Sequence, residues 1–102
     1  MDMTQAALAV IQQRLQELDA IAKDTNETLN AVAGRERVLK WKARTADALA
    51  QQVSQQEGQA FSKANPGPSF TNDLVDEFND EVEFYRAQLT ALRSRMQKIG
   101  PG

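Results

Sequence analysis

Two segments of the chain carry mostly apolar residues at alternating steps of three and four positions, with no break in register. The first run is Leu8, Ile11, Leu15, Leu18, Ala22, Thr25, Leu29 and Val32, and the second is Val75, Phe78, Val82, Tyr85, Leu89, Leu92, Met96 and Ile99. Residues at this spacing fall on one face of an α-helix, so each run predicts a helix about 37 Å long at about 1.5 Å per residue. Such a stripe must be covered by another helix. The predicted fold is therefore an all-α bundle of three long helices with a short extra helix after the second.

The composition restricts the chemistry that the chain can perform. With 102 residues it is long enough for one domain, and we expect residues 1–102 to form a single helical bundle. Cysteine and histidine are both absent, which removes thiol nucleophiles, disulfides, the commonest general base and the commonest transition-metal ligand. A catalytic carboxylate pair such as Glu77 with Glu81 would need a pocket that raises one pKa, and nothing in the sequence indicates one. We therefore predict no enzyme, and no catalytic, cofactor-binding, metal-binding or small-molecule substrate site.

Other features of the sequence bear on location and on partners. No apolar run approaches the roughly 18 residues of a membrane-spanning helix, and the N-terminus lacks the basic and apolar segments of a signal peptide. These observations predict a cytoplasmic protein without a membrane partner. The formal net charge of −2 argues against a general nucleic-acid binder, because such proteins are usually basic. The final Gly100-Pro101-Gly102 resembles a linker, which predicts an N-terminal module of a longer chain.

Local signals predict where the helices end. Gly34 is expected to stop the first long helix, because glycine readily takes the left-handed conformation found at helix C-termini. Ser54 and Glu57 have the spacing of a capping box and predict the start of the short helix. The prolines in residues 65–69 exclude a helix there. The helices that these signals predict span residues 4–33, 35–53 and 54–63, and from Thr71 or Asn72 to residue 99, with the last one stopped at Gly100-Pro101.

The densest basic stretch surrounds the only tryptophan, Trp41, and comprises Arg35, Arg37, Lys40, Lys42 and Arg44. On a helix Arg37, Lys40 and Arg44 share one face, which allows guanidinium stacking on the indole or contact with phosphates. In the other interpretation Trp41 is the core anchor of its helix, and the charges face solvent or pair with acidic residues of the last helix.

Charge is also sorted along the last helix, with acids in its first half and bases in its second. Asp76, Asp80 and Glu83 are predicted to form a face that meets the basic stretch, within one bundle or between two copies. Opposite charges beside an apolar seam select the partner and its direction more than they add affinity. Because residues 35–53 are only thinly apolar, we expect the two seams to need cover from a homo-oligomer or a partner helical domain, with a closed monomeric bundle as the alternative. The predicted partner-binding residues are Arg37, Lys40, Trp41, Phe78, Asp80, Glu83, Tyr85, Leu89 and Leu92.

The run from Arg37 to Leu49, followed by Phe61 and then by Phe78, Tyr85 and Leu89, resembles a known class of small helical modules. These modules precede nucleotide-binding, TIR-like or other effector domains in bacterial signalling and antiphage-defence proteins. The shared elements are a Trp-x-x-Arg-Thr core, a later phenylalanine, and a last amphipathic helix with an aromatic residue near its middle; they cover about residues 36–97. The resemblance implies a helical adaptor that brings together copies of an effector, or an effector and its regulator.

These patterns predict a non-enzymatic helical protein–protein interaction or oligomerisation module of a bacterial signalling or defence protein. Two alternatives stay open. The first is a small regulator that contacts nucleic acid through Arg35 to Arg44, and the second is a phage-type inhibitor protein that binds a host enzyme by its acidic helix.

Overall fold

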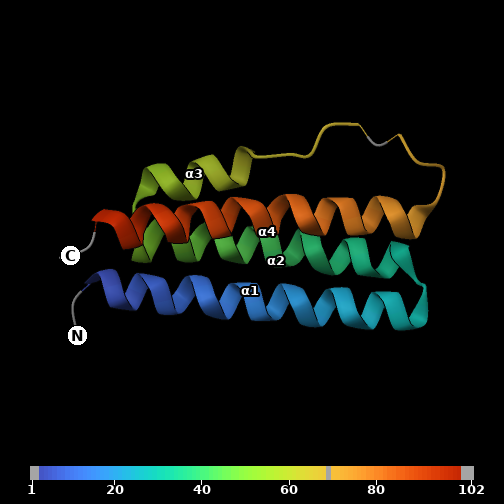
Figure 1. The fold of residues 1–102 in the computed structure, drawn as a ribbon, viewed down its shortest axis with the longest axis horizontal. Helices are drawn as coiled ribbons and strands as arrows, with labels where there is room; N and C mark the ends of the chain where they lie inside the picture. Colours follow the sequence, from blue (N-terminus) through green and yellow to red (C-terminus); the bar gives the residue numbers. More distant parts are fainter. Residues whose placement is uncertain (1–2, 69, 100–102) are drawn as a thin grey trace.

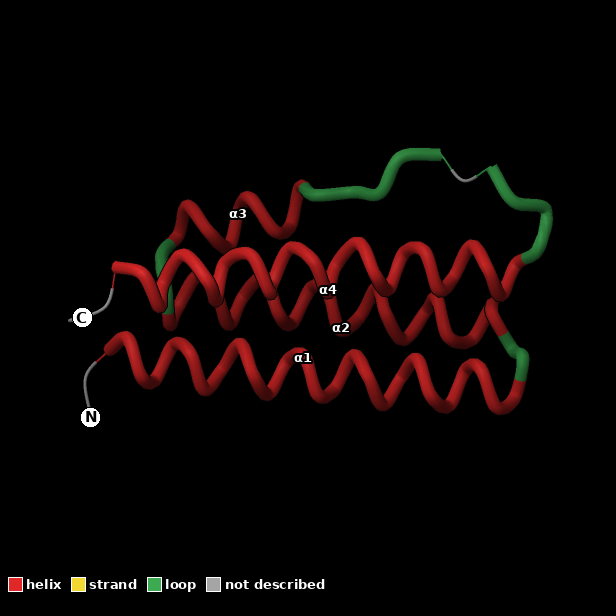
Figure 2. The backbone as a smooth tube through the Cα atoms, viewed as in Figure 1, coloured by secondary structure: helices red, strands yellow, loops and turns green. Residues whose placement is uncertain are grey.

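The computed structural model describes residues 3–68 and 70–99, and over these residues the chain folds into a bundle of α-helices joined by loops (Figures 1 and 2). The helices are α1 (Met3–Thr28), α2 (Ala31–Gln52), α3 (Gln55–Lys63) and α4 (Leu74–Ile99). The three long helices run side by side, and α3 lies along one half of the bundle, near the end where α1 begins and α4 ends (Figure 1). The predicted all-α bundle is confirmed.

The turn between α1 and α2 comes earlier than the sequence predicted. α1 ends at Thr28, and Leu29 follows with a φ of 59°, in the left-handed region that glycine usually occupies. The N–H of Leu29 donates to the carbonyl oxygen of Thr25 (2.7 Å). Asn30 then caps α2, because its side-chain oxygen accepts the N–H of Ala33 (3.1 Å). The expected helix over residues 4–33 is therefore wrong at its C-terminal end.

Gly34, which was expected to stop the first helix, instead lies buried inside α2. A Cβ atom at this position would lie 2.3 Å from Oγ1 of Thr25 and 2.9 Å from a ring carbon of Phe78, so glycine lets α2 approach both α1 and α4 closely. The need for close packing between helices, and not a turn, explains why a glycine occupies this position. Because the turn comes early, Leu29 and Val32 leave the predicted stripe of the first helix and are exposed.

The short helix begins and ends where the sequence predicted. Ser54 is its N-cap, and the hydroxyl oxygen accepts the N–H of Glu57 (3.1 Å). The reciprocal half of the capping box does not form. The Glu57 carboxylate pairs with Arg95 of α4 (2.9 Å), while the N–H of Ser54 donates to the carbonyl oxygen of Leu49 (3.0 Å). Ser54 thus starts α3, and Glu57 of α3 links the helix to α4 through its ion pair with Arg95.

α4 begins at Leu74, slightly later than the predicted Thr71 or Asn72. The Asp73 carboxylate supplies the reason, because it accepts the N–H groups of Val75 (2.8 Å) and Asp76 (3.2 Å) and so caps the first turn. The predicted stop at Gly100-Pro101 lies outside the described residues.

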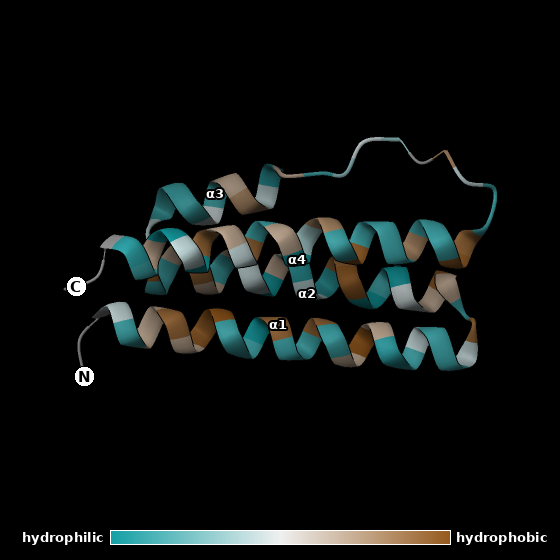
Figure 3. Ribbon diagram, viewed as in Figure 1, coloured by the Kyte–Doolittle hydropathy of each residue, from teal (hydrophilic) through white to brown (hydrophobic). Residues whose placement is uncertain are grey.

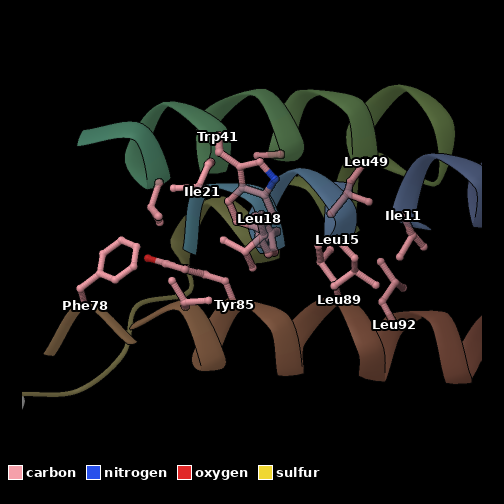
Figure 4. Close-up of a cluster of buried hydrophobic side chains, with 14 of the residues drawn as sticks. Ile11, Leu15, Leu18, Ile21, Trp41, Leu49, Phe78, Tyr85, Leu89 and Leu92 are labelled. Atoms are coloured by element: carbon pink, nitrogen blue, oxygen red, sulfur yellow. The ribbon is translucent and has the colours of Figure 1, made fainter. Parts of the chain in front are cut away.

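The core lies where the faces of α1, α2 and α4 meet (Figure 4). Trp41 of α2 is fully buried in it, and its indole N–H donates to the carbonyl oxygen of Arg14 in α1 (2.9 Å). The indole ring also packs against Phe61 of α3, with ring centroids 5.7 Å apart, and against Tyr85 of α4 at 6.1 Å. The interpretation of Trp41 as the core anchor of its helix is confirmed.

We predict that Trp41→Ala destabilises the bundle by about 3–5 kcal/mol, because it leaves a cavity among three helices and removes the hydrogen bond to the Arg14 carbonyl. Trp41→Phe keeps much of the volume but loses the hydrogen bond to Arg14, and should cost clearly less. Chemical denaturation followed by circular dichroism measures both variants. An unchanged unfolding midpoint for Trp41→Ala would contradict the anchor role.

A second prediction concerns Leu29, in the turn between α1 and α2, and Gly34, inside α2. Leu29→Gly should stabilise the protein by about 0.5–1 kcal/mol, because it relieves the left-handed conformation at an exposed site. Gly34→Ala should destabilise it by about 1–3 kcal/mol, although alanine is ordinarily the better helix residue, because the new methyl group overlaps Thr25. Adding Thr25→Ala should restore part of that loss. A Gly34→Ala variant that unfolds at higher denaturant than the parent would refute the close-packing explanation.

Candidate interaction site

The predicted partner-binding residues divide into a buried set and an exposed set. The apolar members are buried against one another in the core and comprise Trp41, Phe78, Tyr85, Leu89 and Leu92. These side chains therefore belong to the interior of the bundle, and Phe78 also lines a cavity between α2 and α4. The two seams, which we expected to need an outside partner, cover each other and α2 within the one chain (Figure 4). The members that remain on the surface are Arg37, Lys40, Asp80 and Glu83.

The basic stretch does not form one surface, because the helix turns its residues to three sides. Arg35 pairs with Glu81 of α4 (3.6 Å), and Lys42 is buried. Three of its residues do share a face, as the spacing predicted. Arg37, Lys40 and Arg44 line a groove between α2 and α1 together with Glu17, Ala20 and Ile21.

The acidic face of α4 does not meet this basic face within the chain. Glu83 pairs with Arg86 on its own helix (3.1 Å), and Arg86 also pairs with Asp19 of α1. The described ion pairs place neither Asp76 nor Asp80 against α2. The expectation that the two faces mate inside one bundle is therefore wrong over the described residues, and mating between two copies stays a prediction.

A half-open groove between α2 and α4 is the surface that sequence reasoning missed. α3 has nine residues where α2 has 22, so it covers only part of the seam between α2 and α4 before the helix ends and the chain continues as a loop from Ala64 (Figure 1). The uncovered part holds a cavity of about 70 Å³. Its lining comes from both helices: Ala31, Val32 and Arg35 of α2, and Leu74, Glu77, Phe78 and Glu81 of α4.

Exposed apolar side chains gather along this half-open groove. Val32 is 65% exposed and Leu74 is 62% exposed, one on each side of it. Leu39, which is 50% exposed, follows Val32 and Arg35 at helical spacing on α2. Figure 3 shows apolar colour at this end of the bundle, where α4 begins. The shortness of the predicted short helix was the one signal in the sequence that pointed to an uncovered seam.

The polar groups of the half-open groove are two carboxylates and one guanidinium. Burial raises the pKa of Glu81; the Arg35 guanidinium acts to lower that pKa, and the nearby carboxylate of Glu77 adds to the rise. Like charges that crowd a partly buried site are costly unless a cation joins them.

Lys42 lies where α3 ends and the half-open groove begins. Its ammonium group donates to the carbonyl oxygen of Ala64 (2.7 Å) and to Oδ1 of Asn65 (3.2 Å), and it lies 5.2 Å from the centre of the Tyr85 ring. Burial lowers the pKa of Lys42, and the negative charge of Glu81 opposes that shift. The ammonium is thus engaged by the start of the loop and by the tyrosine ring.

Over the described residues the fold is an all-α bundle of three long helices and the short helix α3. No protein family, curated protein or solved structure matches it. Over the described residues, no group of three acidic or other ligand side chains is arranged to hold a metal ion. None of the described helices is both long enough and apolar enough to cross a membrane.

The raised pKa of Glu81 predicts a pH-dependent contribution to stability. A carboxyl whose pKa is raised on folding contributes stability below its usual pKa of 4.5, and loses that contribution as the pH rises through the folded-state value. Glu81→Gln should therefore be more stable than the parent at pH 7, with the difference shrinking as the pH falls toward 4.5. Denaturant midpoints across this range measure it, with Glu27→Gln on the exposed side of α1 as the control. A difference that does not vary with pH would contradict the assignment.

Proposed function

We propose that this chain is a non-enzymatic helical interaction module that receives an apolar helix of a partner protein in the half-open groove. One observation carries the proposal: Val32 and Leu74 expose their side chains in the lining of the cavity, and Leu39 continues the same exposed face of α2 at helical spacing. α3 already shows how a helix sits on the neighbouring part of the same two helices, with Phe61 buried against Trp41 and Tyr85.

The size of this surface favours a reversible complex. Fully burying a valine or leucine side chain is worth about 1.5–3 kcal/mol, and these three side chains are already partly covered. Association must also offset the lost freedom of the two partners. Three anchors therefore suit a transient docking module better than a permanent assembly.

The exposed charges contribute to the proposal in a different way. Arg37 and Lys40 on α2, and Asp80 and Glu83 on α4, are proposed to steer a partner or a second copy into one direction, because rim charges act mainly on association rate and selectivity. A role beside an effector domain in bacterial signalling or defence follows from the resemblance of the sequence, and stays a prediction. The nucleic-acid alternative has less support, since Arg35 and Lys42 do not share the basic face.

The test uses a neutral amphipathic peptide helix as the probe, with leucines at helical spacing on one face and glutamines elsewhere. Leu39→Gln and Leu74→Gln should each weaken its binding to the full chain by roughly tenfold, since each removes an anchor. Leu29→Gln is the matched control, because it makes the same change at an exposed leucine in the turn before α2, outside the helix face that carries Val32, Arg35 and Leu39. Fluorescence anisotropy measures the affinity, and circular dichroism confirms that each variant folds.

Equal binding by the parent and by all three leucine variants would refute docking in the half-open groove. A second arm reverses the charge of Arg37 and Lys40. This change should alter the salt dependence of association with a charged partner and leave the affinity for the neutral peptide unchanged. Tight, salt-sensitive binding of the parent to duplex or single-stranded DNA would instead favour the nucleic-acid alternative.

A further inference from the structure

The dimensions of the half-open groove suit two turns of a helix. The exposed apolar face of α2 from Val32 to Leu39, and the cavity wall on α4 from Leu74 to Glu81, each extend about 10 Å at about 1.5 Å per residue. A helix on this seam would present side chains at positions i, i+3 or i+4, and i+7 toward the exposed apolar residues. This requirement sets the apolar face of the occupant.

The charges around the half-open groove set the rest of its chemistry. Glu77 and Glu81 both line it, and Arg35 is the single cation in its lining. Arg35 is already paired with Glu81, so Glu77 is left without a cation in the described ion pairs. The outer side of the same half of α4 adds Asp76 and Asp80, both exposed. The rim along α4 is therefore acidic.

A second copy of the chain fits this rim poorly. Two of its exposed apolar residues, Phe70 and Leu74, lie close to Asp73, Asp76 and Glu77 in the sequence. Two copies that met through this patch would bring the same carboxylates together, and like charges across an interface are unfavourable. Val32 and Leu39, the exposed apolar residues of α2, lie on the helix face that borders the same half-open groove. Arg37, Lys40 and Arg44 line a different groove, beside α1, so the basic face of α2 does not replace the patch.

Resting on the docking function proposed above, we propose that the occupant of the half-open groove is a basic amphipathic helix of a different protein. Its apolar residues cover Val32, Leu39 and Leu74, and a lysine or arginine beside that apolar face reaches Glu77 and Glu81. The cation supplies the second positive charge that two neighbouring carboxylates require, and it selects against acidic and neutral helices of the same shape.

The test compares three peptides that share one leucine face and differ only in the flanking residues, which are all lysine, all glutamine or all glutamate. Affinity for the full chain at low salt should fall in that order, with at least roughly a tenfold difference between the lysine and glutamate peptides. Glu77→Gln should weaken the lysine peptide roughly two- to fivefold and leave the glutamine peptide unchanged, while Glu27→Gln should change neither. The preference should diminish as salt is added.

The outcomes separate this inference from the function on which it rests. If all three peptides bind with equal affinity and Leu39→Gln abolishes that binding, the docking function stands and the proposal of a basic partner is overturned. If neither Leu39→Gln nor Leu74→Gln changes the affinity, or if no peptide binds, both the docking function and the basic partner are overturned. Sedimentation velocity of the chain alone at tens of micromolar adds an independent check. Self-association that disappears in Leu39→Gln would make a second copy the occupant, and would overturn the inference.

Discussion

The indole of Trp41 is the contact on which the rest of the bundle depends. Its N–H group donates to α1, while its ring packs against α3 through Phe61 and against α4 through Tyr85. One side chain of α2 thus touches every other helix. This explains how α2, whose apolar face is thin, can pack against both α1 and α4. The tryptophan supplies in one residue the apolar volume that the rest of that face lacks.

The position of Phe61 also decides where the surface of the molecule stays open. The short helix covers α2 and α4 only around the tryptophan, and Lys42 holds the start of the loop at that point by its hydrogen bonds to Ala64 and Asn65. Beyond it the same two helices continue without a helical cover, with Val32 and Leu74 exposed. An anchor at one end and an open seam at the other are thus two consequences of a single short element.

Local signals in the sequence predict the structure where one element decides the outcome, and fail where two elements decide it together. Ser54 was recognised as a cap because its partner lies three residues away. Gly34 is predicted as a helix stop but is not one. Its missing side chain leaves room for Thr25 and Phe78, and this role depends on helices that only packing brings together. The prediction that the basic stretch shares one surface fails for the same reason. Lys42 is buried because the loop that begins beyond α3 passes over it, and its hydrogen-bond partner Asn65 is 23 positions away in the sequence.

By itself the sequence determined that the chain is helical, where α3 and α4 begin to within a few residues, and which face of α4 is buried from Phe78 to Leu92. These properties follow from residue spacing and from caps, which act within one or two turns of a helix. Only the tertiary structure decided that the two stripes close within one chain, that Arg35 and Glu81 meet, and that the α2–α4 seam is left half open. Such properties depend on how helices of unequal length cover one another, and no local pattern of residues encodes that.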